Sequence, residues 1–269
     1  MNFQPKLKEV EMKNMVKNIC AAMVISLCAA GHLSATENNP NNDNKFMEEN
    51  LNLTQEWDKT FPQSDKVDHK KITFHNRYGI TLAADLYVPK NVTGKLPAIA
   101  ISGPFGAVKE QASGLYAQTL AERGFLTIAF DPSYTGESSG QPRYVASPDI
   151  NTEDFSAAVD YLSTRDDVDA ERIGILGICG WGGMALNAAA IDTRIKATVT
   201  ATMYDMSRVN ANGYFDSMNA DARHELRRQL NAQRTEDYRN GTFALGGGVV
   251  DPLPADAPQF VKDYHAYYK

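Results

Sequence analysis

The residue best suited to nucleophilic chemistry is Cys179, which stands inside the glycine-dense stretch GILGICGWGG at residues 174–183. The apolar run before it has the composition of a buried strand, and the small residues 182–190 after it have the spacing of a helix. A cysteine at such a sharp bend would meet the first unbonded amides of the helix, which favour a thiolate. The pattern indicates a thiol nucleophile, although a small buried structural cysteine has the same composition.

The elements that would position this thiol alternate along the chain. Two β-branched and aromatic segments with a glycine turn between them predict a hairpin, and four later apolar runs alternate with amphipathic segments. This order is typical of an α/β fold with a mostly parallel sheet and helices on both faces. The predicted strands are residues 71–76, 80–88, 97–102, 125–130, 172–178 and 195–203, and the predicted helices are residues 109–123, 152–163 (capped by Asn151), 182–190 and 221–234.

The segment GICGWGG, placed after the fifth predicted strand, resembles the nucleophile elbow of the α/β-hydrolase fold, in its dienelactone-hydrolase-like branch with a cysteine nucleophile. The segments ISGPFGAVKEQ and FDPSYTGESSG, after the third and fourth strands, are similar to that branch too, so the resemblance covers about residues 71–205. One position departs from the simpler pattern G-x-C-x-G, because Trp181 stands where a glycine is expected. Its side chain must point away from the strand or reshape the turn.

The resemblance implies an oxyanion hole made of two backbone amides, one after the nucleophile and one in the loop after the third strand. Gly180 would supply the first. Pro104 has no N–H to donate, so Phe105 is the expected second donor. Asp131 follows the fourth strand, but Asp-Pro with nearby Ser and Gly favours an ordinary turn there.

The resemblance also implies a catalytic acid and then a histidine downstream of the nucleophile. Asp205 is the candidate acid, although it could equally cap the segment that follows. His265 is the weakest candidate, a possible base with no strand before it to position it. Since no strand pattern follows Met203, the sheet would end in an open apolar edge. The sequence therefore predicts an α/β-hydrolase core truncated after its sixth strand, with two strands, the acid and the histidine in a missing C-terminal portion.

The function that this predicts is hydrolysis of a carboxylic ester, thioester or lactone through an acyl-enzyme on Cys179, with a small-molecule acyl substrate. A non-catalytic binding protein of the same fold is the main alternative, because the chain has no evident catalytic histidine. Dinucleotide binding is a weaker one: residues 180–185 fit G-x-G-x-x-A and Asp205 ends the next strand, but the motif lies too late in the chain.

Composition narrows the class of protein further. Hydrophobic residues make up 43% of the 269 residues and charged residues 22%, as in ordinary globular domains. The net charge of −6 and the lack of a basic cluster argue against a nucleic-acid partner. The five histidines are scattered without metal-ligand spacing, so neither a metal nor another cofactor is expected.

The N-terminus has the pattern of an export signal. Lys13 and Lys17 precede an apolar run at residues 19–30 and the small-residue end LSA, which predicts a signal peptide over residues 1–35 and a periplasmic or secreted protein. A lipid anchor at Cys28 is the less favoured variant. Residues 36–56 would form a polar tether, residues 57–205 the core, and residues 206–269 an incomplete, helical, lid-like C-terminal segment.

Overall fold

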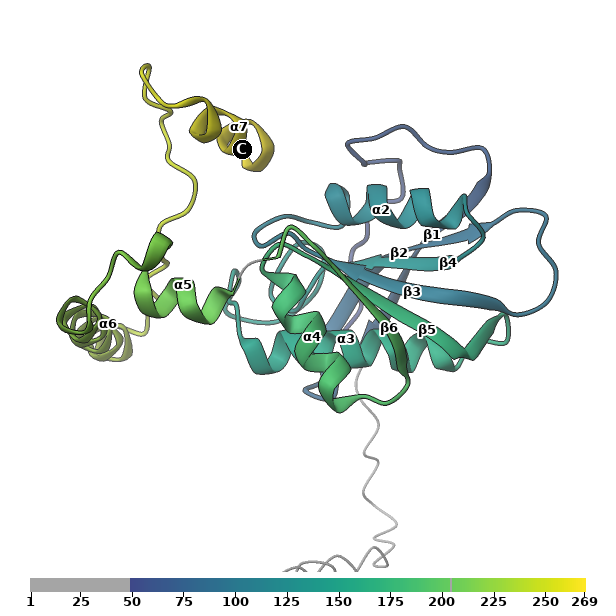
Figure 1. Ribbon diagram of the computed structural model, residues 1–269, viewed down its shortest axis with the longest axis horizontal. Helices are drawn as coiled ribbons and strands as arrows, with labels where there is room; N and C mark the ends of the chain where they lie inside the picture. The colour runs from purple at the N-terminus through teal and green to yellow at the C-terminus, as the bar shows by residue number, and fades with distance from the viewer. Residues whose placement is uncertain (1–48, 204) are drawn as a thin grey trace, which may run out of the picture. The chain divides into compact units, whose positions relative to one another are not determined.

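The computed structural model describes residues 49–203 and 205–269, in which a six-stranded sheet carries the fold (Figure 1). The strands follow the order β1-β2-β4-β3-β5-β6 across the sheet. The elements along the chain are β1 (Val67–His75), β2 (Thr81–Pro89), β3 (Leu96–Ser102), α2 (Ala112–Ala121), β4 (Leu126–Phe130), α3 (Pro148–Ser163), β5 (Val168–Ile178), α4 (Trp181–Ile191), β6 (Ile195–Ala201), α5 (Met206–Asn212), η1 (Tyr214–Asp216), α6 (Ala220–Asn240) and α7 (Gln259–Tyr268).

The direction of the strands confirms the predicted α/β class. β1 and β2 form the expected hairpin, and β2 pairs antiparallel with β4. β3 pairs parallel with both β4 and β5, and β5 pairs parallel with β6. The parallel part of the sheet therefore contains the strands that end at the candidate site.

Helices lie on both faces of the sheet, as Figure 1 shows for α2 on one face and α3 with α4 on the other. The larger apolar cluster is centred between the sheet and α3 and α4, where Phe155, Leu162 and Ile175 are buried. A smaller cluster joins α2 to the other face through Ala117 and Ala121. β4 is buried along its whole length, which explains why its sequence is a continuous apolar run instead of an alternating one.

Two helix boundaries differ from the prediction by four residues or more. α3 begins at Pro148, four residues early, because a proline suits the first helical position and Ser147 takes the cap position. Asn151 is therefore inside the helix, where its side chain accepts the Ser147 N–H. α6 extends six residues beyond its predicted end, and it stops at Gly241, whose φ of 64° ends a helix without a Cβ clash.

The C-terminal edge of the sheet matches the expectation. β6 pairs with β5 alone and is only partly buried, and no strand occurs within residues 205–269. Within the described chain, no helix has the length and apolar content that a membrane crossing needs. The predicted signal peptide, residues 1–35, lies outside the described residues. The described end of the predicted tether, residues 49–56, forms no helix or strand, but Thr54 N–H donates to Glu137 Oε1 over 2.7 Å.

Candidate functional site

Cys179 occupies the bend between β5 and α4 with a φ of 57°. This left-handed conformation is uncommon for a residue with a Cβ, and it persists only where the surrounding structure holds it. Here the Cys179 N–H donates to Ala201 O over 2.9 Å, and its carbonyl accepts the Gly182 N–H over 3.0 Å. The side chain is half-buried and the thiol is free. The strained bend predicted from the sequence is present.

Glycines make this bend possible by removing side chains from close backbone contacts. A Cβ on Gly177 would lie 2.4 Å from Trp181 O and 2.7 Å from Trp181 C, so β5 and the start of α4 touch through that glycine. The Trp181 side chain is directed away from the strand toward the loop after β3, where a Cβ on Gly103 would lie 2.9 Å from Trp181 Cβ. The departure from G-x-C-x-G is thus accommodated by a glycine in a different loop.

The loop after β3 lies directly against the bend. A Cβ on Gly103, whose φ is 99°, would lie 2.4 Å from Ile178 O, so the two backbones are in contact. The Phe105 ring packs edge-on against Trp181 with centroids 5.2 Å apart, and it also faces Gly180. The N–H groups of Gly180 and Phe105 donate to no acceptor among the described residues. Phe105 and Gly180 are therefore neighbours, and the role of their two N–H groups as oxyanion donors stays a prediction.

Apolar and aromatic side chains lie against the glycines on either side of the bend and of the neighbouring loop. Met206 lies against Gly180, and Met203 packs against Gly182. The Tyr268 ring of α7 lies 3.8 Å from the position of a Cβ on Gly106, in the same loop. Burial and then the nearby Cys179 thiol raise the pKa of Tyr268 to about 12, so the phenol stays protonated. An acyl group on Cys179 would meet an apolar surface.

The α7 helix is held over this loop by two hydrogen bonds. Gln111 Nε2 donates to Tyr267 O over 2.8 Å, and the Ala112 N–H donates to Tyr267 Oη over 3.2 Å. The C-terminal segment thus contacts the core next to the candidate site.

The candidate acid and base are not brought to Cys179. Asp205 is exposed and caps α5, where its side chain accepts the Arg208 N–H over 2.9 Å. His265 lies on α7, and its Nε2 is 3.9 Å from Asp251 Oδ1. No hydrogen bond joins His265 to Cys179 in the described part of the chain. The alternative role of Asp205 as a helix cap is confirmed, whereas a catalytic role for either residue stays a prediction.

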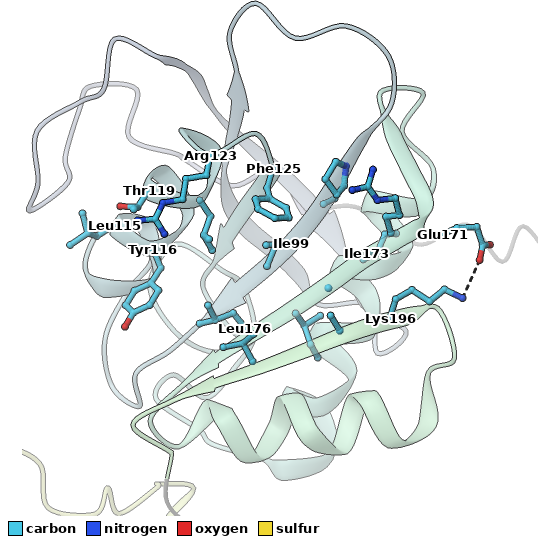
Figure 2. Close-up of a pocket in the computed structure, with 18 residues that line it drawn as sticks. Ile99, Leu115, Tyr116, Thr119, Arg123, Phe125, Glu171, Ile173, Leu176 and Lys196 are labelled. Atoms are coloured by element: carbon cyan, nitrogen blue, oxygen red, sulfur yellow. Dashed lines mark ion pairs between the residues drawn. The ribbon is translucent and has the colours of Figure 1, made fainter.

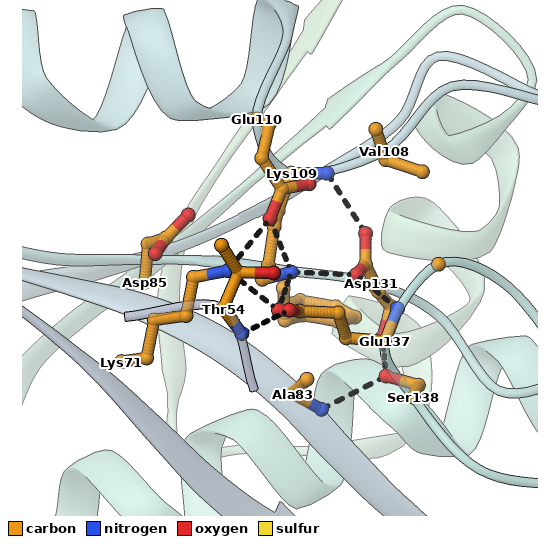
Figure 3. A network of polar contacts seen from close by, with 12 residues as sticks. Thr54, Lys71, Ala83, Asp85, Val108, Lys109, Glu110, Asp131, Glu137 and Ser138 are labelled. Atoms are coloured by element: carbon orange, nitrogen blue, oxygen red, sulfur yellow. Dashed lines mark hydrogen bonds and ion pairs between the residues drawn. The ribbon is translucent and has the colours of Figure 1, made fainter. Parts of the chain in front are cut away.

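The sequence interpretation missed a buried charged cluster beside the loop after β3. Asp131, favoured as a turn residue, does accept the Glu137 N–H over 2.9 Å. Its carboxylate also accepts hydrogen bonds from the backbone N–H and from the side chain of Lys109. Figure 3 shows Lys109 among Glu110, Asp131 and Glu137. The sequence did offer a signal: a lysine lies in the segment that follows one strand, and an aspartate directly follows the strand beside it in the sheet.

A cavity also lies elsewhere on the sheet. Its volume is 790 Å³, and it is lined by residues of β3, β5 and β6 beside α2, including Ile99, Leu176 and Val199 (Figure 2). Lys196 and Glu171 form an ion pair of 3.2 Å at one end. Cys179 does not line this cavity, so the cavity marks an apolar face of the sheet and not the site of the thiol. The described residues hold no cluster of three or more metal-ligating side chains.

The sheet order, the helices on both faces and the strained elbow together define an α/β-hydrolase fold. Within this class the sequence profile of the X-Pro dipeptidyl-peptidase (S15) family matches residues 78–245, and the chain belongs to this family.

Two bacterial proteins are similar over much of the chain. The uncharacterized protein PA2218 of Pseudomonas aeruginosa is 60% identical over 249 residues, which cover 92% of this chain and 66% of that protein. Its crystal structure superposes with a TM-score of 0.78 over 82% of this chain and 69% of that one, at 65% identity. Protein YcjY of Escherichia coli is 43% identical over 182 residues, 66% of this chain and 59% of that protein. The chain thus spans less than two thirds of the YcjY length and 66% of the PA2218 length.

A more distant similarity involves an enzyme with a named reaction. The thiohydrolase aneE of Aspergillus aculeatus is 29% identical over 137 residues, which cover 51% of this chain and 42% of that protein.

Proposed function

We propose that the chain forms the nucleophile-bearing core of a hydrolase that cleaves ester, thioester or lactone bonds through an acyl-enzyme on Cys179. The observation that carries this proposal is the φ of 57° at a half-buried free cysteine between a strand and a helix. Backbone strain of this kind concentrates at active sites, and this bend is the position of the nucleophile in the fold. Membership of the S15 family and similarity to a thiohydrolase support the same class of reaction.

The chemistry would proceed in two displacements. Cys179 Sγ bonds to the substrate carbonyl carbon, and the carbonyl oxygen gains the negative charge that the Gly180 and Phe105 N–H groups would bind. The bond to the leaving group then breaks, and the leaving group departs with the electron pair and takes up a proton. Water attacks the resulting acyl thioester, which releases the carboxylic acid and restores the thiol.

The thiol proton needs an acceptor in this scheme. Within the described residues, the contacts of His265 do not include Cys179. We therefore propose that the base is a histidine that the described residues do not bring to Cys179. Residues 206–269 would then act as a lid-like segment beside the site.

The test uses p-nitrophenyl acetate and the full chain. The expected result is the release of nearly one equivalent of p-nitrophenolate, and a single acetyl group located by mass spectrometry on the peptide that contains Cys179. The matched control is Cys179→Ala, which should lose both. Equal rates for the two proteins would contradict the proposal and favour a non-catalytic binding protein of the same fold.

The family match favours a second substrate class, which the same proteins can test. An X-Pro p-nitroanilide would be cleaved if the chain acts as its family name describes, whereas a short-chain acyl thioester would be preferred by a thiohydrolase. Comparison of kcat/KM for the two substrates decides between them.

A further inference from the structure

The side chain of Lys109 is fully buried beside the candidate site, and no step of the proposed reaction uses it. Its ammonium group contacts three carboxylates: Asp131 Oδ2 at 2.9 Å, Glu137 Oε2 at 2.7 Å and Glu110 Oε1 at 2.5 Å (Figure 3). Burial opposes the charged form, but the carboxylates outweigh it and raise the pKa of Lys109. The lysine is therefore a permanent buried cation.

The Asp131 carboxylate accepts two hydrogen bonds from Lys109. Its Oδ1 accepts the Lys109 backbone N–H over 2.8 Å, while its Oδ2 accepts from the Lys109 side chain. Asp131 is fully buried and follows the last residue of β4, and Gly136 leaves room for it, since a Cβ there would lie 2.2 Å from Asp131 Oδ2. The carboxylate consequently fixes the main chain after β3 to the end of β4.

The contact between Lys109 and Asp131 fixes one end of the loop that carries the Phe105 N–H. The other end is Gly103, whose backbone touches Ile178 O next to the bend. Between them the Ala107 N–H donates to Pro104 O over 3.1 Å, which folds residues 104–107 into a tight turn around Phe105. Phe105 is thus held between a contact with the elbow and a buried ion pair.

We propose that Lys109 and Asp131 are positioning residues that hold the Phe105 amide in place for the oxyanion. This inference rests on the proposed function, because it assigns these residues a part in the acylation of Cys179. A buried ion pair stabilises a fold little more than a well-packed apolar pair, and its fixed geometry suits it to this task. Without the pair the loop after β3 would keep its Gly103 contact but lose its second anchor.

The experiment separates reactions of Cys179 that need an oxyanion hole from one that does not. Acylation by p-nitrophenyl acetate develops an oxyanion, whereas alkylation by iodoacetamide forms a carbon–sulfur bond with loss of iodide and develops none. In Lys109→Met we expect acylation to fall by about 10–100-fold, since displacing a catalytic donor by about 1 Å costs that much. Alkylation should stay within about two-fold of the wild type.

Two further variants protect the test against a general loss of structure. Asp131→Asn keeps the shape and one acceptor of the carboxylate, and it should show the same selective loss in a milder form. Lys71→Met is the matched control: Lys71 is 4% exposed and binds Glu137 at 2.7 Å in the same cluster, but it does not bind Asp131 or the loop backbone. Lys71→Met should either leave acylation and alkylation unchanged or lower both to the same extent.

Hydrogen exchange supplies a readout that does not require catalysis. In Lys109→Met the amides of residues 103–108 should exchange faster, and those of residues 177–183 should not. Unchanged exchange in the loop, or a loss of acylation without loss of alkylation in Lys71→Met as large as in Lys109→Met, would overturn the inference. Wild-type protein that shows no acetyl group on Cys179 would instead overturn the proposed function, and the catalytic part of this inference with it.

Discussion

The contact between Gly177 and the start of α4 gives a sharp prediction for Gly177→Ala. The added Cβ would lie 2.4 Å from Trp181 O, 2.7 Å from Trp181 C and 2.8 Å from Gly182 Cα. Ordinary contacts between carbon atoms lie at about 3.5–4.0 Å, so α4 must move away from β5 by about 1 Å. All three obstructing atoms belong to the backbone, so no side chain can move aside to relieve the contact.

The magnitude follows from this displacement. Overpacking of this kind costs about 1–3 kcal/mol of the free energy of unfolding. Because α4 carries the Gly180 amide on its first turn, a shift of about 1 Å should also lower the rate of Cys179 acylation by about 100-fold. Gly183→Ala is the matched control, since Gly183 lies in the same helix and a Cβ there would meet nothing within 4 Å. That change should stabilise the protein by about 0.5–1 kcal/mol and leave acylation unchanged.

Unfolding in urea, followed by the fluorescence of Trp181 and the half-buried Trp57, measures the first effect. The burst of p-nitrophenolate measures the second. If Gly177→Ala unfolded at the same urea concentration as Gly183→Ala and acylated as fast as the wild type, the close contact at the elbow would not be what positions the nucleophile.

Changes at three other residues test separate parts of the structure. Asp205→Asn should keep both the α5 cap and the acylation rate, while Asp205→Ala should increase amide exchange in α5 alone. Loss of acylation in Asp205→Asn would support Asp205 as the catalytic acid. Hydrogen bonds from Lys109 and Lys71 outweigh burial and lower the pKa of Glu137 to about 2, so its stabilisation is present above pH 4.5 and is lost as the pH falls toward 2. After allowance for solvent screening this stabilisation amounts to about 1–2 kcal/mol. Between pH 5 and pH 2 the free energy of unfolding of Glu137→Gln should therefore fall by about 1–2 kcal/mol less than that of the wild type. Buried Asp154 accepts hydrogen bonds from Ser133, Asn76 and Asn151, so Asp154→Ala should cost about 3–5 kcal/mol in thermal unfolding, and a loss below about 1 kcal/mol would contradict that role.

Local patterns were sufficient to predict the strands and the elbow, and they also name the two candidate oxyanion donors. The strand before Cys179, the glycines around it and the missing N–H of Pro104 are all properties of short segments, so they can be interpreted without knowledge of the fold. The accommodation of Trp181 could not be predicted in this way. The space for its side chain is provided by Gly103, which lies in another loop.

The ion pair between Lys109 and Asp131 illustrates the same limit. Its members are 22 residues apart, and each belongs to a segment whose composition is typical of an ordinary connection. Only the order of the strands brings them together. The start of α3 was missed for a different reason, because Pro148 and Ser147 form an N-terminus that apolar periodicity does not detect.

The order of the strands also explains why the loop after β3 can be held from two sides. β3 lies between β4 and β5, and all three run parallel, so their C-terminal ends share one edge of the sheet. The chain leaving β3 can therefore be fixed from both sides, by Asp131 after β4 and by the elbow after β5. A strand at the edge of the sheet has a neighbour on one side only, so the loop after it lacks a second support. The position of β3, more than the composition of its loop, makes the Phe105 amide a site that two neighbouring strands can fix.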